Sequence, residues 1–314
     1  MILQEFPDLQ WLKQQINQRF QDRVGYGNRP LDAEGFPNVI INTTTTTTFR
    51  PDILGPISLF LNKKGTSRCR VDNRTVAIPP DYFFISNCFQ EYTLEIESKE
   101  PVETFNIHIG DAFSQGVFSA LLTPTDTILN NGLQQTVPTV AFHNKLYRKD
   151  ASFNALAYRL QQHKPNDFNK VLFEEDMTHL LVYLLQQHRD LVKQMQQLPP
   201  VKKTTRLEVY KRLSFAIDAI HSQSSAPLDI DALAATACLS KFHFLRLFKQ
   251  AFGRSPYQYM QQLRLEKATH LLKHTTLSIN EIAVSLGFEN SNSFSRLFLQ
   301  RHRVYPSQYR TLIN

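Results

Sequence analysis

Cysteine and long apolar runs are scarce in this chain of 314 residues. The three cysteines, Cys69, Cys88 and Cys238, lie far apart and form no Cys-x-x-Cys pair, which fits a reducing compartment and argues against disulfides and structural zinc. No apolar run approaches the roughly 18 residues that a membrane-spanning helix needs. The N-terminal stretch MILQEFPDLQWLKQQINQRF has helical spacing and lacks the apolar segment of a signal peptide. We therefore expect a cytoplasmic protein with no membrane partner.

Positive charge is concentrated in the second half of the chain. The formal net charge is +7. From Val201 to the end there are 16 lysines and arginines against 7 acidic residues, a net charge of +9. Residues 1–200 hold 19 against 21, a net charge of −2. This asymmetry is typical of a domain that meets a polyanion joined to one that does not, although a solvated basic surface would have the same composition.

Residues 38–110 have the composition of β-structure. Short runs rich in β-branched and aromatic residues, such as GPISLFL, RTVAIPP and YTLEIES, alternate with turn residues. Strands at about ten-residue spacing are typical of a sandwich or a small barrel. Thr43–Thr48 are six consecutive threonines. They fit low-complexity sequence, a strand with hydroxyls on both faces, or an edge segment near a pocket, and the sequence leaves these alternatives open.

From about Asp150 the apolar spacing becomes helical. Residues 168–198 contain neither glycine nor proline, so we expect one long helix there. Two lines of residues repeat every seven positions, as in the a and d lines of a heptad: Met177, Leu184, Leu191 and Leu198, then Leu181, His188 and Met195. Such a seam can pack on the chain's own β-domain or form a helical dimer interface, and both alternatives remain open. We interpret His188 as a polar register residue rather than a metal ligand.

The clearest boundary is the stretch LPPVKKTT, residues 198–205. Two prolines stop the preceding helix, and Thr204 or Thr205 can cap the next one. We therefore predict one domain over residues 1–200, a linker over 201–205 and a helical domain over 206–314. No strand pattern follows the linker.

The helical domain contains a duplicated pattern. Asp229 can cap a helix with apolar residues spaced i, i+3, i+4 and i+7, and Ser278 can cap a second helix with the same spacing. A tight break follows each one, the second at Gly287, and then another amphipathic helix. This order predicts two helix-turn-helix units, at about 230–252 and 279–302.

The second helix of each unit repeats the string F-x-R-L-F. At 100° per residue its apolar positions face the core, while Arg246 and Arg296 point outward. Arginine can bond bidentately to guanine, asparagine to adenine, and an apolar group can contact the thymine methyl. A solvated surface is the alternative for each exposed side chain. The predicted DNA-contacting residues are Lys241, Phe242, His243, Leu245, Arg246, Lys249, Ser291, Asn292, Ser293, Ser295 and Arg296.

A rigid helix is expected between the two units. Residues 255–275 begin with Ser255-Pro256, a cap followed by the first helical position, and contain no later helix breaker. Such a helix spans roughly 27 Å, which is of the order of one DNA turn, ~34 Å. Pro306–Tyr309 repeat the P-x-Q-Y string and open a final short helix.

These residues resemble the AraC/XylS family of bacterial transcription regulators. The resemblance covers about Leu213–Leu312, and from Ala283 to Arg310 the chain carries the pattern A-x-x-L-G-F, F-x-R-x-F and P-x-x-Y-R. It implies seven helices whose two recognition helices enter successive major grooves. By position it makes Phe242, Leu245, Arg246, Asn292, Ser293 and Arg296 the base-reading candidates. Arg301-His302 depart from the family pattern, which often has a glycine or hydrophobic residue after the helix.

The first half resembles the family's cupin-like sensor domains more loosely, through its strand spacing and the string AIPPDYFFIS. The resemblance implies an α+β chain of two domains: an N-terminal β-barrel (cupin-like) with flanking helices and an all-α C-terminal domain. It further implies a small-molecule effector in the barrel, a homodimer, RNA polymerase as partner of an activator, and a nucleoid-associated location in the bacterial cytoplasm. His108 alone in the β-region does not make a metal site, so no cofactor is expected.

Two enzyme classes compete with the regulator hypothesis. One is a cupin-type metalloenzyme with an accessory DNA-binding domain, which stoichiometric iron or zinc in the purified protein would support. The other is a DNA-repair methyl acceptor with a cysteine zinc site, which needs clustered cysteines that the sequence does not have. We therefore expect double-stranded DNA as partner and no enzymatic activity.

Overall fold

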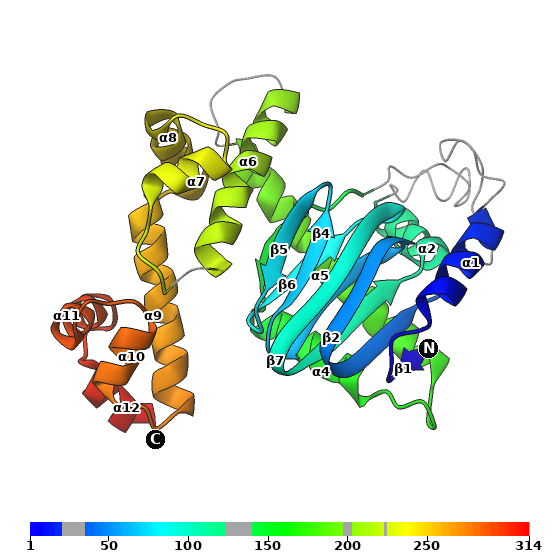
Figure 1. The fold of residues 1–314 in the computed structure, drawn as a ribbon, viewed down its shortest axis with the longest axis horizontal. Coiled ribbons are helices and arrows are strands. Elements are labelled where there is room, and N and C mark those ends of the chain that lie inside the picture. The colour runs from blue at the N-terminus through cyan, green and yellow to red at the C-terminus, as the bar shows by residue number, and fades with distance from the viewer. Residues whose placement is uncertain (21–34, 123–139, 197–202, 223–224, 314) are drawn as a thin grey trace. The chain divides into compact units, whose positions relative to one another are not determined.

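The computed structural model describes residues 1–20, 35–122, 140–196, 203–222 and 225–313. Within these ranges the chain forms two compact units, Met1–Asp190 and Leu191–Asn314. The first holds all the described strands and the second is helical (Figure 1). The predicted α+β class with two domains is confirmed.

One sheet organises the first unit. Its hydrogen-bonded order is β1-β2-β7-β3-β6-β8, with β4 paired to both β5 and β7. The parallel pair is β1 with β2, and the other pairs are antiparallel. The strands are β1 (Ile2–Leu3), β2 (Val39–Gly55), β3 (Ile57–Lys64), β4 (Ser67–Val71), β5 (Arg74–Ile78), β6 (Tyr82–Ser86), β7 (Gln90–Ile109) and β8 (Leu146–Arg148).

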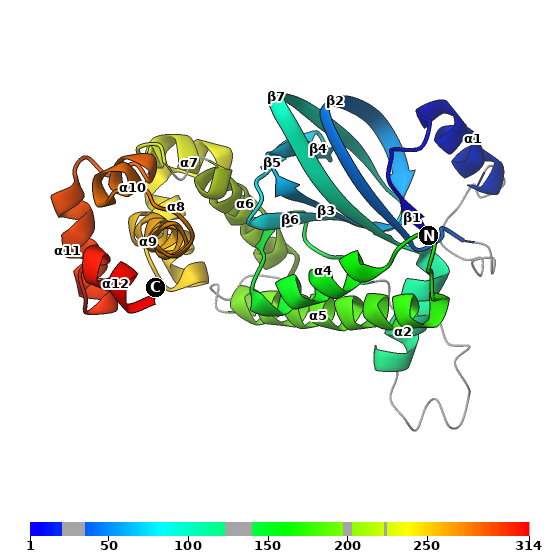
Figure 2. The ribbon, with the colours of Figure 1, turned by 90° about the horizontal axis from the view of Figure 1, so that it is seen from below.

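The two longest strands bend the sheet. β7 pairs along its length with β2, but on its other side its first half pairs with β4 and its second half with β3. The register shift at Thr45/Thr47 puts extra residues into β7, and the shift at Arg50/Ile53 puts one extra residue into β2. Such bulges increase local twist and bend a strand. β2 and β7 therefore arch over β3 and β6 (Figure 2). The cupin-like barrel stays a prediction.

The threonine run is part of strand β2. Thr43 pairs with Thr104 of β7, and their hydroxyl oxygens lie 2.8 Å apart in the buried part of the sheet. Between Thr45, which pairs with Val102, and Thr47, which pairs with Glu97, Thr46 lies opposite four residues of β7, so the irregularity belongs to β7. The run is therefore in a strand, and among the described strands it pairs with β7 alone, because β1 meets β2 only at Ile40 and Ile41.

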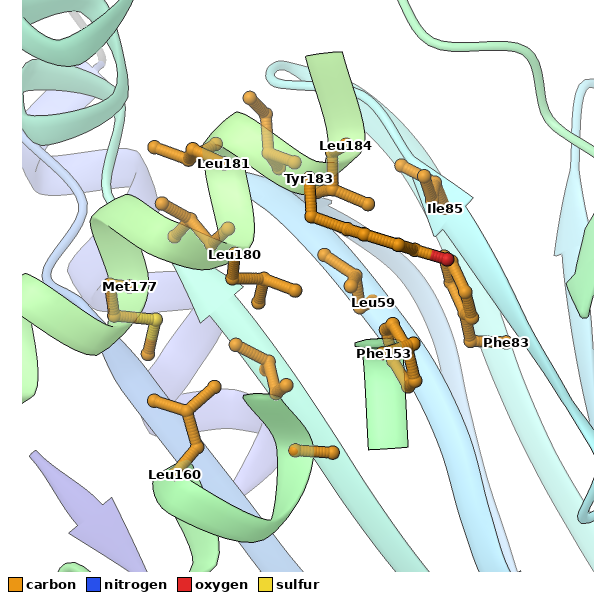
Figure 3. Packing of buried hydrophobic residues seen from close by; sticks show 14 of the residues in the cluster. Leu59, Phe83, Ile85, Phe153, Leu160, Met177, Leu180, Leu181, Tyr183 and Leu184 are labelled. Atoms are coloured by element: carbon orange, nitrogen blue, oxygen red, sulfur yellow. The ribbon is translucent and has the colours of Figure 1, made fainter. Parts of the chain in front are cut away.

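Helices cover one face of this sheet (Figure 2). They are α2 (Asp111–Leu122), α4 (Ala151–Gln162) and α5 (Lys170–Gln196), while α1 (Leu9–Phe20) lies near β2. The Phe153 ring of α4 stacks on Phe83 of β6 at 4.2 Å between centroids. Met177, Leu181 and Leu184 of α5 are fully buried in the same cluster (Figure 3). This part of the heptad seam therefore packs on the chain's own sheet, which is the first of the two alternatives for it.

His188 lies at the end of this cluster. Its ring is half-buried and meets the edge of Phe142 at 5.8 Å, and burial lowers the pKa of the imidazole. A neutral, partly buried ring fits packing. Among the described residues, no group of three His, Cys, Asp or Glu side chains could hold a metal ion.

The linker predicted at 201–205 needs a correction at its C-terminal end. Helix α6 begins at Lys203, so Lys203, Thr204 and Thr205 are helical, while residues 201 and 202 lie outside the described residues. After Pro200 the next glycine or proline is Pro227, beyond the end of α6, so nothing prevents the helix from starting one or two residues before the expected cap at Thr204 or Thr205.

Seven helices build the described part of the second unit. They are α6 (Lys203–Ser222), α7 (Ile230–Thr236), α8 (Lys241–Phe252), α9 (Pro256–His274), α10 (Ile279–Ser285), α11 (Ser291–His302) and α12 (Pro306–Ile313). α9 runs between the α7–α8 pair and the α10–α11 pair (Figure 1). No helix in the described ranges combines the length and apolarity needed to cross a membrane.

Candidate nucleic-acid interface

Capping side chains fix where each helix-turn-helix begins. Asp229 accepts hydrogen bonds from the amides of Asp231 and Ala232 at the start of α7. Ser278 starts α10 with a capping box, in which Glu281 reaches back to the Ser278 amide at 2.7 Å. The Asp229 and Ser278 caps are as predicted from the sequence. A cap of this type stabilises a helix by about 1 kcal/mol.

The cap of α11 was missed by the sequence analysis. Asn290 is the N-cap of this helix, and its side chain accepts a hydrogen bond from the Ser293 amide at 2.8 Å. The signal was available, since asparagine is among the preferred N-cap residues. Asn290 was not singled out because Ser291 and Asn292, which follow it directly, also suit turns.

Each turn passes through a left-handed residue. Gly287 has φ +77° in the second unit, whereas the equivalent residue in the first unit is Cys238, with φ 50°. The recognition helices end in the same conformation, α8 at Gly253 and α11 at Arg303. Arg301-His302, which depart from the family pattern, are the last residues of α11. The helix then ends at Arg303, a non-glycine residue in the left-handed region. That conformation costs an L-residue about 1–2 kcal/mol.

Replacing Cys238 with glycine is expected to raise the free energy of unfolding of the helical unit by about 0.5–1 kcal/mol. Glycine adopts the left-handed conformation without steric cost, and part of the gain is lost to its larger entropy when unfolded. Urea denaturation followed by circular dichroism measures the change. Cys238→Ala keeps the strain and serves as the control, so equal stabilisation by both variants would contradict the backbone explanation.

The outer face of α8 carries exposed side chains around a buried core stripe. Phe244 and Phe248 are fully buried, while Arg246 is exposed and Leu245 is half-buried. Phe242 is 85% exposed, so it is not a hydrophobic staple that packs at the helix start. Lys241, His243 and Lys249 are also exposed. A basic and aromatic surface is therefore available on this helix.

The outer face of α11 is more polar. Phe294 and Phe298 are fully buried, and Asn292 and Arg296 are exposed. The hydroxyl-bearing candidates divide: Ser293 is exposed, whereas Ser291 and Ser295 are half-buried. Arg246 and Arg296 thus occupy equivalent outward positions, two residues after the first buried phenylalanine of each helix.

One predicted contact residue already has a partner in its own unit. The Lys241 ammonium lies 2.8 Å from the Asp231 carboxylate of α7, and both side chains are largely exposed. An exposed ion pair of this kind contributes about 1 kcal/mol or less. Lys241 can therefore exchange Asp231 for a phosphate at small cost.

Arg264 of α9 joins the two helix-turn-helix units, and the sequence analysis did not single it out. Its guanidinium donates to the carbonyl of Gly287 at 2.9 Å and to the carbonyl of Ala226 at 2.8 Å. It also lies 5.6 Å from the centre of the Phe288 ring. Ala226 precedes the first unit and Gly287 is in the turn of the second, so one side chain fixes the spacing of both. No local pattern reveals such a contact, because both carbonyls are far from Arg264 along the chain.

Helix α9 starts as expected. Ser255 caps it with a capping box that includes Gln258, and Pro256 occupies the first turn. Tyr259, near its start, contacts Phe248 and Phe252 of α8, whereas Ala268 and Leu272, near its end, are buried in one cluster with α10 and α11. The helix therefore contributes to both cores as well as spanning them.

Comparison with known proteins identifies the second unit. Residues 233–311 match the family of a helix-turn-helix domain. The transcriptional regulator MtrA of Neisseria gonorrhoeae is 35% identical over 100 residues, 32% of this chain and 33% of that protein. The transcriptional activator RhaR of Escherichia coli K12 is 31% identical over 159 residues, 50% of this chain and 51% of that protein.

A solved structure of the DNA-binding domain of AdpA in complex with a target DNA is 26% identical. It covers 32% of this chain and 91% of that chain, with a TM-score of 0.31. This chain spans about half or less of the length of the curated relatives it matches. The family predicted from the sequence is confirmed for the helix-turn-helix part of the chain.

Proposed function

We propose that this chain, whose C-terminal part is an AraC-type helix-turn-helix domain, is a sequence-specific DNA-binding transcription regulator. Helices α8 and α11 enter successive major grooves of double-stranded DNA. The observation that carries this proposal is the equivalent outward placement of Arg246 and Arg296 on α8 and α11, the two helices that α9 connects. The net charge of +9 from Val201 onward supplies the attraction for phosphate.

The two recognition helices read different bases. Arg246 and Arg296 bond to guanine, Asn292 bonds to adenine, and the exposed Phe242 ring contacts a thymine methyl. Lys241 and Lys249 contact phosphates and give affinity without specificity. Because α8 offers Phe242 and Leu245 where α11 offers polar side chains, each subunit recognises an asymmetric site.

The first unit acts as the sensor in this proposal. A small molecule binds in the β-domain and a homodimer forms, and RNA polymerase is the further partner if the chain activates transcription. The sheet supports this role because its inner face, the face turned away from α2, α4 and α5, holds many buried polar side chains. An ordinary packed core does not need such side chains. The proposal includes no enzymatic step.

Arg246→Ala and Arg296→Ala are each expected to weaken specific binding by about 1–3 kcal/mol, or roughly tenfold to a hundredfold. Binding is measured on a footprinted site selected from random DNA, at constant salt. Each variant should also relax the base preference at one position, and the two positions should differ.

Lys273→Ala is the matched control, since it removes one exposed charge from the same unit but lies on α9. It should lower binding to specific and random DNA alike, and by less. If neither arginine variant changes the ratio of specific to random binding, the assignment of base reading is wrong.

A further inference from the structure

The inner face of the sheet carries a row of polar side chains. Ser86, Ser58 and His108 are direct neighbours on β6, β3 and β7, and all three are buried. Neighbouring residues in register point to the same face of a sheet. Leu59 and Ile107, one position along, belong instead to the core cluster that includes residues of α4 and α5, and Leu59 is seen there in Figure 3. The polar row therefore faces away from the helices.

Arg50 of β2 belongs to this interior and is not satisfied there. Its side chain is 8% exposed, and one guanidinium nitrogen, Nη2, is buried without a hydrogen-bond partner. The Phe6 ring covers the guanidinium at 5.2 Å. A buried, partly unpaired charge is costly and is retained where a partner completes it.

Apart from the Asp8 carboxylate, the groups that interact with the Arg50 charge are uncharged. Its charge acts on Tyr92 and His108, whose rings lie 4.7 Å and 6.1 Å from the Phe60 ring. Burial is the main cause that lowers the pKa of His108 to about 4, so this imidazole is uncharged at neutral pH. Asp8 is the carboxylate whose charge reaches Arg50. That carboxylate also accepts from the Trp11 amide at the start of α1.

Two more donors on this face have no partner. The Asn106 Nδ2 amide is buried and unpaired, although its Oδ1 accepts from the Leu61 amide. The Ser86 hydroxyl is likewise buried without a partner. Three hydrogen-bonding groups that lack a partner among the described residues, one of them cationic, each call for a ligand or an ordered water.

We propose that the inner face of the β-sheet binds a small organic carboxylate, with Arg50 as its anchor. This inference rests on the proposed sensor role and names the chemical class of the effector. Phe6 occupies the flat face of the guanidinium, so the carboxylate binds at its N–H edge, where arginine forms two parallel hydrogen bonds. Phe60 and Tyr92 supply apolar contact for the rest of the ligand.

Thermal unfolding of the full chain tests the proposal, with benzoate and hexanoate as probes and benzamide and hexanamide as uncharged matches. At least one carboxylate should raise the melting temperature while its amide does not. Arg50→Met should weaken the carboxylate effect about tenfold or more, because the charge-assisted pair is lost. Arg50→Lys should retain part of it. Arg68→Met removes an exposed arginine from the same sheet and should bind as the unmodified chain does.

Stability without ligand gives a second readout. Because methionine removes a buried unpaired charge, Arg50→Met should be at least as stable as the unmodified chain, whereas loss of stability would make Arg50 a structural residue. The proposal is overturned if no carboxylate raises the melting temperature, or if carboxylate and amide act equally. DNA binding is measured separately. Carboxylate binding without specific DNA binding would refute the proposed regulator but not this site. Specific DNA binding without carboxylate binding would refute this site alone.

Discussion

Gly287→Ala is expected to lower the free energy of unfolding of the helical unit by about 3 kcal/mol or more. The residue has φ +77°, a conformation that costs an L-residue about 1–2 kcal/mol. An added Cβ would also lie 2.0 Å from the Ser225 carbonyl oxygen. Backbone cannot move aside as a side chain can, and forced overpacking costs about a further 1–3 kcal/mol. Hydrogen exchange at the amides of α10 and α11, in the full chain, measures the loss.

Gly253→Ala separates the two causes. Gly253 has φ +71°, but its added Cβ would meet nothing within 4 Å. This variant should therefore lose about 1–2 kcal/mol from the backbone conformation alone. If both variants lose equal stability, the close approach of Ser225 contributes nothing, and the turn of the second unit is not held against the segment before the first.

The helical unit was predictable because its signals are local. Asp229 and Ser278 are caps within three residues of the groups that they bind, and Phe244, Phe248, Phe294 and Phe298 follow the helical period. The special turn conformation was predictable at Gly287, where the residue type announces it. It was not predictable at Cys238 or Arg303, because tertiary packing imposes a conformation that these residue types rarely adopt.

The first unit was predictable in class but not in arrangement. Alternating runs indicated strands, yet the pairing of Thr43 with Thr104 joins residues about sixty positions apart, and no local pattern encodes such a register. The heptad of α5 predicted the buried positions Met177, Leu181, Leu184 and Leu191 but not their partner, while Leu198 lies outside the described residues. Met177 and Leu184 pack on the sheet. Its apolar side chains accept this buried stripe as well as those of a second helix would have done, so the stripe alone does not identify its partner.

Arg264 marks the limit of sequence reasoning at the candidate DNA interface. On a helical period it reads as one more charged residue of a basic domain. Its role depends on two carbonyls, at Ala226 and Gly287, which other parts of the chain bring to it. Arg50 in the sheet is a parallel case: only the fold buries it and leaves a nitrogen without a partner. Both arginines are identified by their contacts rather than by their position in a motif.

Arg264→Met is expected to destabilise the helical unit by about 3 kcal/mol. Each of the two hydrogen bonds from the charged guanidinium contributes about 1.5–3 kcal/mol, and the contact with the Phe288 ring adds roughly 0.5–1 kcal/mol. Packing of the methionine side chain recovers part of the stability lost with these contacts. Arg264→Lys keeps the charge and one bond, so its loss should be intermediate. Arg301→Met removes an exposed arginine of α11 and should cost less than 0.5 kcal/mol.

The same variant should weaken DNA binding in a particular way. Two recognition helices held at a fixed spacing bind a full site with only one loss of translational freedom, so their linkage raises the affinity beyond that of either alone. When Arg264 no longer holds Ala226 and Gly287 together, the spacing varies and this gain falls. Affinity for a full site should drop about tenfold at a temperature where the variant remains folded, while affinity for an isolated half-site should hardly change. If both affinities fall by the same factor, Arg264 stabilises the unit without positioning its two reading helices.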